Sequence, residues 1–78
     1  MVQPSQIMEH MEVVGSDGEH VGTVDHMEGS DRIKLTKDDS SDGKHHMIPL
    51  DWVDSIDGDS VVLSKPAAEA MRSWEAAM

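Results

Sequence analysis

Apolar and polar residues alternate on both sides of an Asp-Gly pair near the start of the chain, and this pattern predicts a β-hairpin. The two strands are expected at about Met11 to Gly15 and about Glu19 to Met27. Gly18, in the loop between them, is expected to take a positive φ, because glycine has no Cβ that would clash there. The hairpin indicates a small, mostly-β domain that must protect the edges of its sheet.

The register of this hairpin can be predicted from its apolar positions. A three-residue loop at 16–18 places Val13 opposite Val21. That register alone would turn Val24 away from the apolar face. One extra residue at Gly22, a β-bulge, returns Val24 to that face and bends the strand, as closure of a small barrel requires.

Further strands and turns are expected as far as residue 63. Ile33 and Leu35 are expected to point inward from a strand at 32–36, and Ile48 from a strand at 45–49. The remaining expected features are an exposed polar loop at 37–44, a corner at 50–53 and a last hairpin at 56–63 around the turn at 57–59.

The end of the chain predicts an α-helix at about residues 65–77. Ser64 is expected to cap this helix, and Pro66 suits its first turn. Its apolar face is formed by Ala67, Ala70, Met71, Trp74 and Met78. The expected fold class is therefore mostly β: one domain over residues 1–78, with a five- or six-stranded antiparallel barrel at about 11–63 and this C-terminal helix.

Composition and charge exclude several classes of function. The 78 residues include 16 acidic and 6 basic ones, which gives a formal net charge of −10. This charge repels phosphate backbones and anionic lipids, so neither nucleic acid nor a membrane is expected as a partner. Cysteine is absent, which excludes disulfides and thiolate metal sites. No segment is apolar enough to span a bilayer, and the first residues lack a secretion signal, so a cytoplasmic location is expected.

The polar residues give little indication of catalysis. The sequence has no cysteine nucleophile, no Gly-x-Ser-x-Gly motif and no glycine-rich phosphate loop. Several aspartates lie in predicted turns, where such side chains ordinarily accept hydrogen bonds from nearby backbone N–H groups: Asp17, Asp31, Asp42, Asp57 and Asp59. We therefore expect no enzyme activity, no catalytic residue and no cofactor.

The histidines suggest a second kind of function. The chain has five of them: His10, His20, His26, His45 and His46. His45 and His46 are neighbours in a predicted strand and so point to opposite faces, with His46 on the inward face. Only the fold could bring His20 close to His45. No metal ligand is predicted, and a small metal- or ligand-binding protein that uses surface histidines and carboxylates is the alternative.

Two segments resemble a known family. They read Asp-Gly-Glu-x-Val-Gly at 17–22 and Ile-Pro-Leu-Asp-Trp-Val at 48–53. From about 11 to 63, the chain resembles the barrel domains of the photosynthetic reaction centre (PRC) group, and within it a short bacterial family of unknown function. The resemblance implies a small β-barrel used for protein contacts, as in the reaction-centre H subunit and a ribosome-maturation factor. It carries over no functional residues.

The tryptophans allow two interpretations. Trp52 and Trp74 are expected in the core, and the rival interpretation is that one of them anchors a partner, since Trp is enriched at interface hot spots. The methionines are open to the same two interpretations. We expect a non-enzymatic barrel module that acts through protein–protein contacts or self-association, of which a homodimer is one form.

Overall fold

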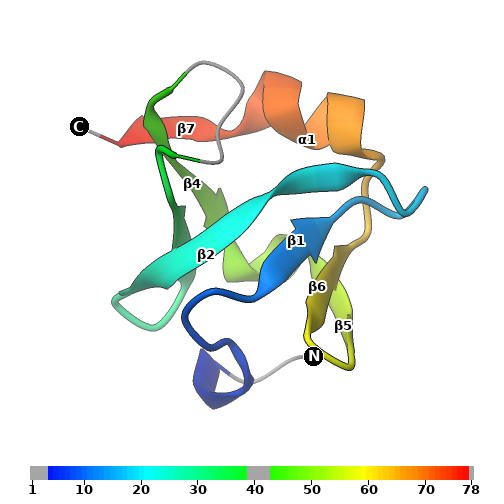
Figure 1. Ribbon diagram of the computed structural model, residues 1–78, viewed down its shortest axis with the longest axis horizontal. Helices are drawn as coiled ribbons and strands as arrows, with labels where there is room; N and C mark the ends of the chain where they lie inside the picture. The colour runs from blue at the N-terminus through cyan, green and yellow to red at the C-terminus, as the bar shows by residue number, and fades with distance from the viewer. Residues whose placement is uncertain (1–3, 39–42, 78) are drawn as a thin grey trace.

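Short strands with alternating apolar residues line up in one mixed β-sheet, with a single α-helix beside it (Figure 1). The computed structural model describes residues 4–38 and 43–77. The elements in chain order are η1 (Pro4–Gln6), β1 (Glu12–Val14), β2 (His20–Glu28), β3 (Arg32–Leu35), β4 (His45–Pro49), η2 (Leu50–Trp52), β5 (Val53–Asp57), β6 (Ser60–Leu63), α1 (Ala67–Ser73) and β7 (Glu75–Ala77). The predicted hairpins, the corner and the strand at 45–49 are confirmed.

The order of the strands makes the sheet open rather than closed. The seven strands run β5-β6-β1-β2-β3-β4-β7, and β1 pairs with β6 in parallel while the other neighbours are antiparallel. The two ends of this order, β5 and β7, do not pair with each other in the described ranges. The predicted mostly-β fold with a C-terminal helix is confirmed, but the predicted closed barrel of five or six antiparallel strands is wrong. Alternation reports which face of a strand is buried and not which distant strand lies beside it.

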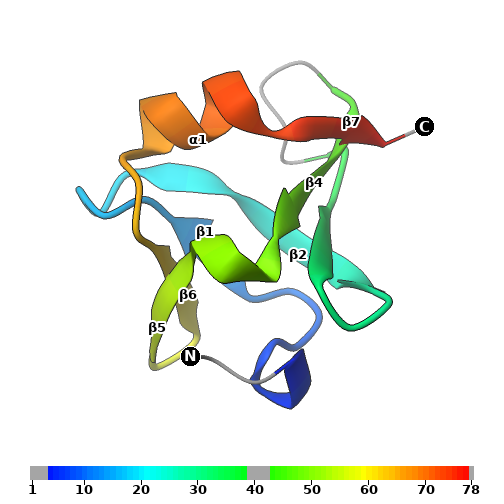
Figure 2. The ribbon, with the colours of Figure 1, turned by 180° about the vertical axis from the view of Figure 1, so that it is seen from behind.

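The long strand β2 connects the two halves of the sheet. It has nine residues, and it pairs with β1 in one half and with β3 in the other. In Figures 1 and 2, β2 crosses the molecule diagonally, with β1, β6 and β5 on one side and β4 on the other. The helix α1 lies against β2.

The first hairpin has the predicted kind of turn and a bulge close to the predicted place. Gly18 has a φ of 81°, and the Gly15 N–H donates to the carbonyl of Glu19 at 2.8 Å. Val13 lies opposite Gly22 and Val14 opposite His20, so the extra residue of the bulge is Val21 rather than Gly22.

The pairing of Val13 with Val21 is therefore wrong, because the bulge falls one residue earlier than predicted. Its expected effect is nevertheless seen. The Val24 N–H donates to the carbonyl of Met11 at 2.9 Å, and Val24 is fully buried.

The turn of this hairpin also holds the start of α1. The Ser16 N–H donates to the Lys65 carbonyl at 2.8 Å, and the Asp17 carboxylate accepts the N–H of Glu19 at 3.2 Å and that of Ala67 at 3.4 Å. The residue at the N-cap of α1 is Pro66, which offers no side-chain cap. The prediction that Ser64 caps the helix is wrong, because an acceptor from the distant first turn takes that role.

The helix is shorter than the predicted range of 65–77. It ends at Ser73, and Trp74 has extended backbone angles, with φ −68° and ψ 158°. The chain then pairs with β4 as the strand β7. The ring of Trp74 stacks on that of His46, with ring centroids 3.9 Å apart and planes at 10°. Helical periodicity cannot show this change, because the partner that favours it lies on β4.

The buried residues form one core on the inward face of the sheet. Ile33, Leu35 and Ile48 are at most 1 % exposed, as predicted, and Ala67 and Ala70 of the helix are buried with them. Met71 and Trp74 pack against this core, so most of the predicted apolar face of the helix covers its own sheet. Met78 and part of the predicted loop at 37–44 lie outside the described residues. No helix in the described ranges is both long enough and apolar enough to cross a membrane.

Candidate functional site

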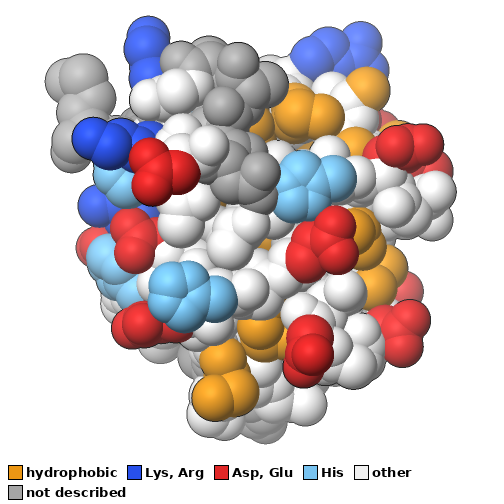
Figure 3. All heavy atoms as spheres, in the orientation of Figure 1, with side chains coloured by type: hydrophobic (Ala, Val, Ile, Leu, Met, Phe, Trp, Pro, Cys, Tyr) orange, Lys and Arg blue, Asp and Glu red, His pale blue; other side chains and the backbone are white. Residues whose placement is uncertain are grey.

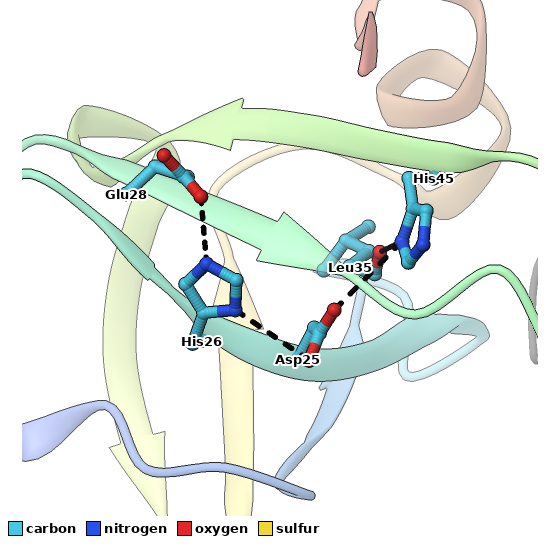
Figure 4. A network of polar contacts seen from close by, with 5 residues as sticks. All are labelled: Asp25, His26, Glu28, Leu35 and His45. Atoms are coloured by element: carbon cyan, nitrogen blue, oxygen red, sulfur yellow. Dashed lines mark hydrogen bonds and ion pairs between the residues drawn. The ribbon is translucent and has the colours of Figure 1, made fainter. Parts of the chain in front are cut away.

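Polar side chains of β2 and β4 form a network on the surface (Figure 4). His26 lies between two carboxylates: its Nδ1 is 3.5 Å from Asp25 Oδ1 and its Nε2 is 2.6 Å from Glu28 Oε1. Asp25 is an extra residue of β2, because Val24 pairs with Leu35 and His26 already pairs with Lys34. This bulge directs the Asp25 carboxylate toward His26 and toward β4 (Figure 4).

Asp25 also approaches a histidine of β4. His45 Nδ1 lies 3.8 Å from Asp25 Oδ2 and 3.0 Å from the backbone carbonyl of Leu35. Leu35 belongs to β3, so the network spans three neighbouring strands. His45 is partly exposed, which agrees with its predicted outward position.

The carboxylates change the acidity of His26. The hydrogen bond with Glu28 is the largest cause that raises the pKa of His26 above its usual value of 6.5, and Asp25 adds to it by hydrogen bonding and charge. Partial desolvation acts in the opposite direction. The side chain of His26 is 43 % exposed, so water screens these charges and the network is a surface feature.

The network does not have the form of a metal site. Within residues 4–38 and 43–77, no three histidine or carboxylate side chains are placed to hold one ion. The nitrogens of His26 and His45 face carboxylate and carbonyl oxygens instead of one shared point.

The other histidines lie in separate surroundings. His20 Nδ1 is 3.0 Å from Glu12 Oε2 on the neighbouring strand β1, whereas His45 contacts β2 and β3. These contacts do not join His20 to His45. His46 is 5 % exposed, on the face of Ile48 as predicted, and its Nδ1 is 3.2 Å from the Glu75 carbonyl. His10 has a φ of 70° in an exposed turn.

The two tryptophans and the methionines Met11, Met27 and Met71 pack in or against the core. Trp52 and Trp74 are partly buried against it, and the Lys65 ammonium lies 4.9 Å from the centre of the Trp52 ring. Met11 is buried, while Met8 is 66 % exposed. Both tryptophans thus pack against the core as predicted while staying partly exposed, and the interpretation that one of them anchors a partner stays a prediction.

The most open part of the sheet is its β5 end. In the part of the chain that the structure describes, β5 has β6 as its only strand neighbour. Figure 2 shows β5 at the outside of the molecule, with no strand beyond it. Four exposed aspartates lie on β5 and the turns that flank it: Asp51, Asp54, Asp57 and Asp59. We name this strand with its four aspartates the acidic edge.

The aspartates of the acidic edge form no ion pair with another described residue. No Lys, Arg or His occurs between residues 51 and 63. On the face that Figure 3 shows, acidic side chains lie toward the lower right, and Lys and Arg lie in the upper half. In the described part of the chain these carboxylates are therefore unpaired, and Lys65, over the Trp52 ring, is a cation that lies near this edge.

The other end of the sheet, at β7, differs from the acidic edge because its carboxylate has a cationic partner. The strand β7 has three residues, and its Glu75 carboxylate lies 3.6 Å from the Arg32 guanidinium.

Sequence reasoning missed the acidic edge, because a closed barrel would leave no open strand. Four acidic residues and no basic one within 51–60 are the signal that was present in the sequence.

Comparison with known proteins identifies a family for this chain. Residues 7–71 match the model of a family described as uncharacterized protein conserved in bacteria (DUF2171). The chain belongs to this family. The expected membership of a bacterial family of unknown function is confirmed, and nothing in the match links DUF2171 to the PRC group. No curated protein matches the chain.

The family match spans the features described above. It includes both bulges of β2, the whole of β5 and β6, and most of α1, and it ends before Trp74 and β7. The acidic edge and the network of Asp25 and His26 thus both lie within the part of the chain that defines its DUF2171 membership.

Proposed function

We propose that this DUF2171 protein acts by binding another protein along an open edge of its sheet, and that it does not catalyse a reaction. The observation that carries the proposal is that β5 has only β6 as a strand neighbour in the described ranges. An edge strand presents backbone N–H and C=O groups that an extended segment of another chain can pair with.

The setting of the titratable groups supports contact rather than catalysis. A pair of catalytic carboxylates, or a catalytic base, is usually placed where burial or a charged partner shifts its pKa strongly. The side chains of Asp25, His26 and Glu28 are 36 %, 43 % and 46 % exposed, so water screens them. This setting favours a role in surface contacts.

The resemblance to PRC barrels adds a second line of support. The motifs at 17–22 and 48–53 are similar to those of barrel domains that work through protein contacts. We extend the proposal to a PRC-type relationship and to a cytoplasmic location.

Self-association is the other form that such contact could take. Two β5 strands that paired with each other would bring their aspartates together, and like charges across a strand pair are destabilising. We therefore propose a different protein as the occupant of β5, and a homodimer would have to use another surface.

The proposal is tested by affinity capture and cross-linking with the purified domain in a lysate of its source. We expect cross-links from residues beside β5. Ile56→Pro should abolish capture because proline removes an edge N–H, whereas Ile56→Ala, which also removes the core contact but keeps the N–H, should retain it. A capture that is unchanged in Ile56→Pro would contradict the use of this edge. Saturable binding of zinc or of a small metabolite, without any protein partner, would favour the alternative of a metal- or ligand-binding protein.

A further inference from the structure

We propose that β5 binds an extended, positively charged peptide segment of the partner protein, in which Lys or Arg side chains alternate with aliphatic ones. This inference rests on the proposed function and adds the chemistry of the partner to it. It follows from three properties of the acidic edge: its negative charge, the direction of its backbone N–H and C=O groups, and the short stretch of β5 that pairs regularly with β6.

The first property is charge. Asp54, Asp57 and Asp59 are exposed on or beside the open strand, and no described cation pairs with them. A partner strand laid along β5 would come within reach of these carboxylates. Cationic side chains at alternate positions would neutralise them, whereas an acidic or neutral segment would leave them unpaired or repelled.

The second property is the direction of the backbone groups. The loop between β5 and β6 has two residues, Gly58 and Asp59, and Gly58 has a φ of 61°, as a type II′ hairpin turn requires. In such a hairpin the flanking pair, Asp57 and Ser60, is the hydrogen-bonded one. Antiparallel alternation then turns the N–H and C=O of Ile56 away from β6 and toward the open edge.

The third property is length. Val53 pairs with Leu63 and Ser55 with Val62, so Asp54 is an extra residue that interrupts the ladder. A bulge in an edge strand limits pairing with another chain. The regular part left for a partner is Ser55 to Asp57, which suits a short linear segment rather than a whole sheet.

The side chains of this regular part set the alternation. Ile56 is partly buried and packs against the core, while Ser55 and Asp57 are exposed. Neighbouring residues of a strand point to opposite faces. An aliphatic side chain of the partner therefore lies beside Ile56, and its cationic neighbours lie on the face of Asp57.

The test uses a short peptide of alternating lysine and valine with blocked ends, titrated into the full-length, isotope-labelled protein and followed by NMR. We expect saturable shifts centred on Ile56 and its neighbours, and slower exchange of the Ile56 amide. A peptide with the same lysines but proline in place of valine tests strand formation, and an alternating glutamate–valine peptide tests charge. Both should fail to bind.

Two matched triple variants separate this edge from the overall charge. Asp54→Asn, Asp57→Asn and Asp59→Asn together should weaken binding roughly tenfold, because each exposed ion pair contributes about 0.2–1 kcal/mol. The control replaces three exposed carboxylates elsewhere, with Glu9→Gln, Glu19→Gln and Asp38→Asn, and removes the same charge. The control should bind with less than about a twofold change.

The outcomes separate this inference from the proposed function. Equal weakening in both triple variants, or equal binding of the proline-containing peptide, would overturn the inference, because the peptide would then sense only net charge. If the lysine–valine peptide does not bind but lysate capture is still lost in Ile56→Pro, the partner uses the edge without being cationic. In that case the inference fails and the proposed function stands.

Discussion

Two glycines in the turn of the first hairpin have different physical roles at the residue scale. A Cβ on Gly15 would lie 2.3 Å from the Ala67 nitrogen and 2.8 Å from the Pro66 carbonyl carbon, both of them backbone atoms. A Cβ on Gly18 would meet no atom within 4 Å, but Gly18 has a φ of 81°. Gly15 is therefore needed for space and Gly18 for conformation.

This difference gives the first prediction. Gly15→Ala should lower the free energy of unfolding by about 3 kcal/mol, because the start of α1 must move away. Gly18→Ala should cost about 1–2 kcal/mol through backbone strain alone, and Gly18→Asn less, since Asn tolerates the left-handed region. Urea denaturation measures the loss in the free energy of unfolding for each of the three variants. Equal losses at Gly15 and Gly18 would contradict the close approach of the turn to α1.

The cap of α1 gives the second prediction. Asp17→Ala removes the acceptor for the N–H groups of Glu19 and Ala67 and should cost about 1 kcal/mol. Ser64→Ala should change stability by less than about 0.5 kcal/mol, because Ser64 does not cap the helix. Thermal melts compare the two variants. A larger drop in melting temperature for Ser64→Ala than for Asp17→Ala would contradict this assignment and favour Ser64 as the cap.

These residues show what local sequence can and cannot predict. The conformation of Gly18 follows from a turn type that its immediate neighbours determine, and it was predicted correctly. The capping role of Asp17 depends on Ala67, which lies 50 residues further along the chain. A local capping rule finds Ser64 instead, because it considers only residues next to the helix.

At the scale of elements, the network on β2 and β4 gives a prediction about pH. The pKa of His26 is raised in the folded protein, so the contacts of its protonated ring stabilise the fold fully below pH 6.5. This stabilisation is lost as the pH rises through the raised pKa. The difference in the free energy of unfolding between the native protein and Glu28→Gln should therefore decrease as the pH rises through the raised pKa of His26. NMR titration should find the pKa of His26 above 6.5 and lower in Glu28→Gln.

A matched variant controls for charge in this titration. Glu69→Gln removes an exposed carboxylate from α1 and should leave the titration of His26 unchanged. If Glu28→Gln and Glu69→Gln shift the pKa of His26 equally, the cause is the overall negative charge and not the hydrogen bond of 2.6 Å to Glu28.

The same scale shows why some elements were predicted and others were not. The strands at β3 and β4 have one buried face, so alternation locates them well. The residues of β7 were assigned to the helix, because Trp74 fits a helical apolar stripe. Its stacking on His46 and the pairing of β7 with β4 are long-range contacts that no local pattern contains.

At the scale of the whole molecule, pairing between distant strands decides the shape. The parallel pair of β1 and β6 lies between two hairpins that are far apart in the sequence. A barrel is the common way to remove sheet edges, and sequence reasoning assumed it. Among the described residues, β5 instead lies at an open end of the sheet and has aspartates on and beside it. The candidate binding edge was missed for this reason.

The net charge gives a prediction at this scale. The formal charge of −10 should lower stability in dilute buffer through self-repulsion, and screening should restore it. The ion pairs among the described residues are mostly histidine–carboxylate contacts on the surface, which contribute little. The melting temperature should therefore rise on adding ~0.15 M salt. A lower melting temperature in salt would mean that attractive pairs dominate.

The open edge at β5 is the central claim, and the exchange of one amide tests it most directly. In the free protein, the Ile56 amide should exchange with solvent faster than the amides of Ser55 and Asp57, whose residues belong to the hydrogen-bonded pairs with β6. Adding the lysine–valine peptide should slow the exchange at Ile56. An Ile56 amide that is already as protected as its neighbours in the free protein would contradict the account, because the edge would then be closed.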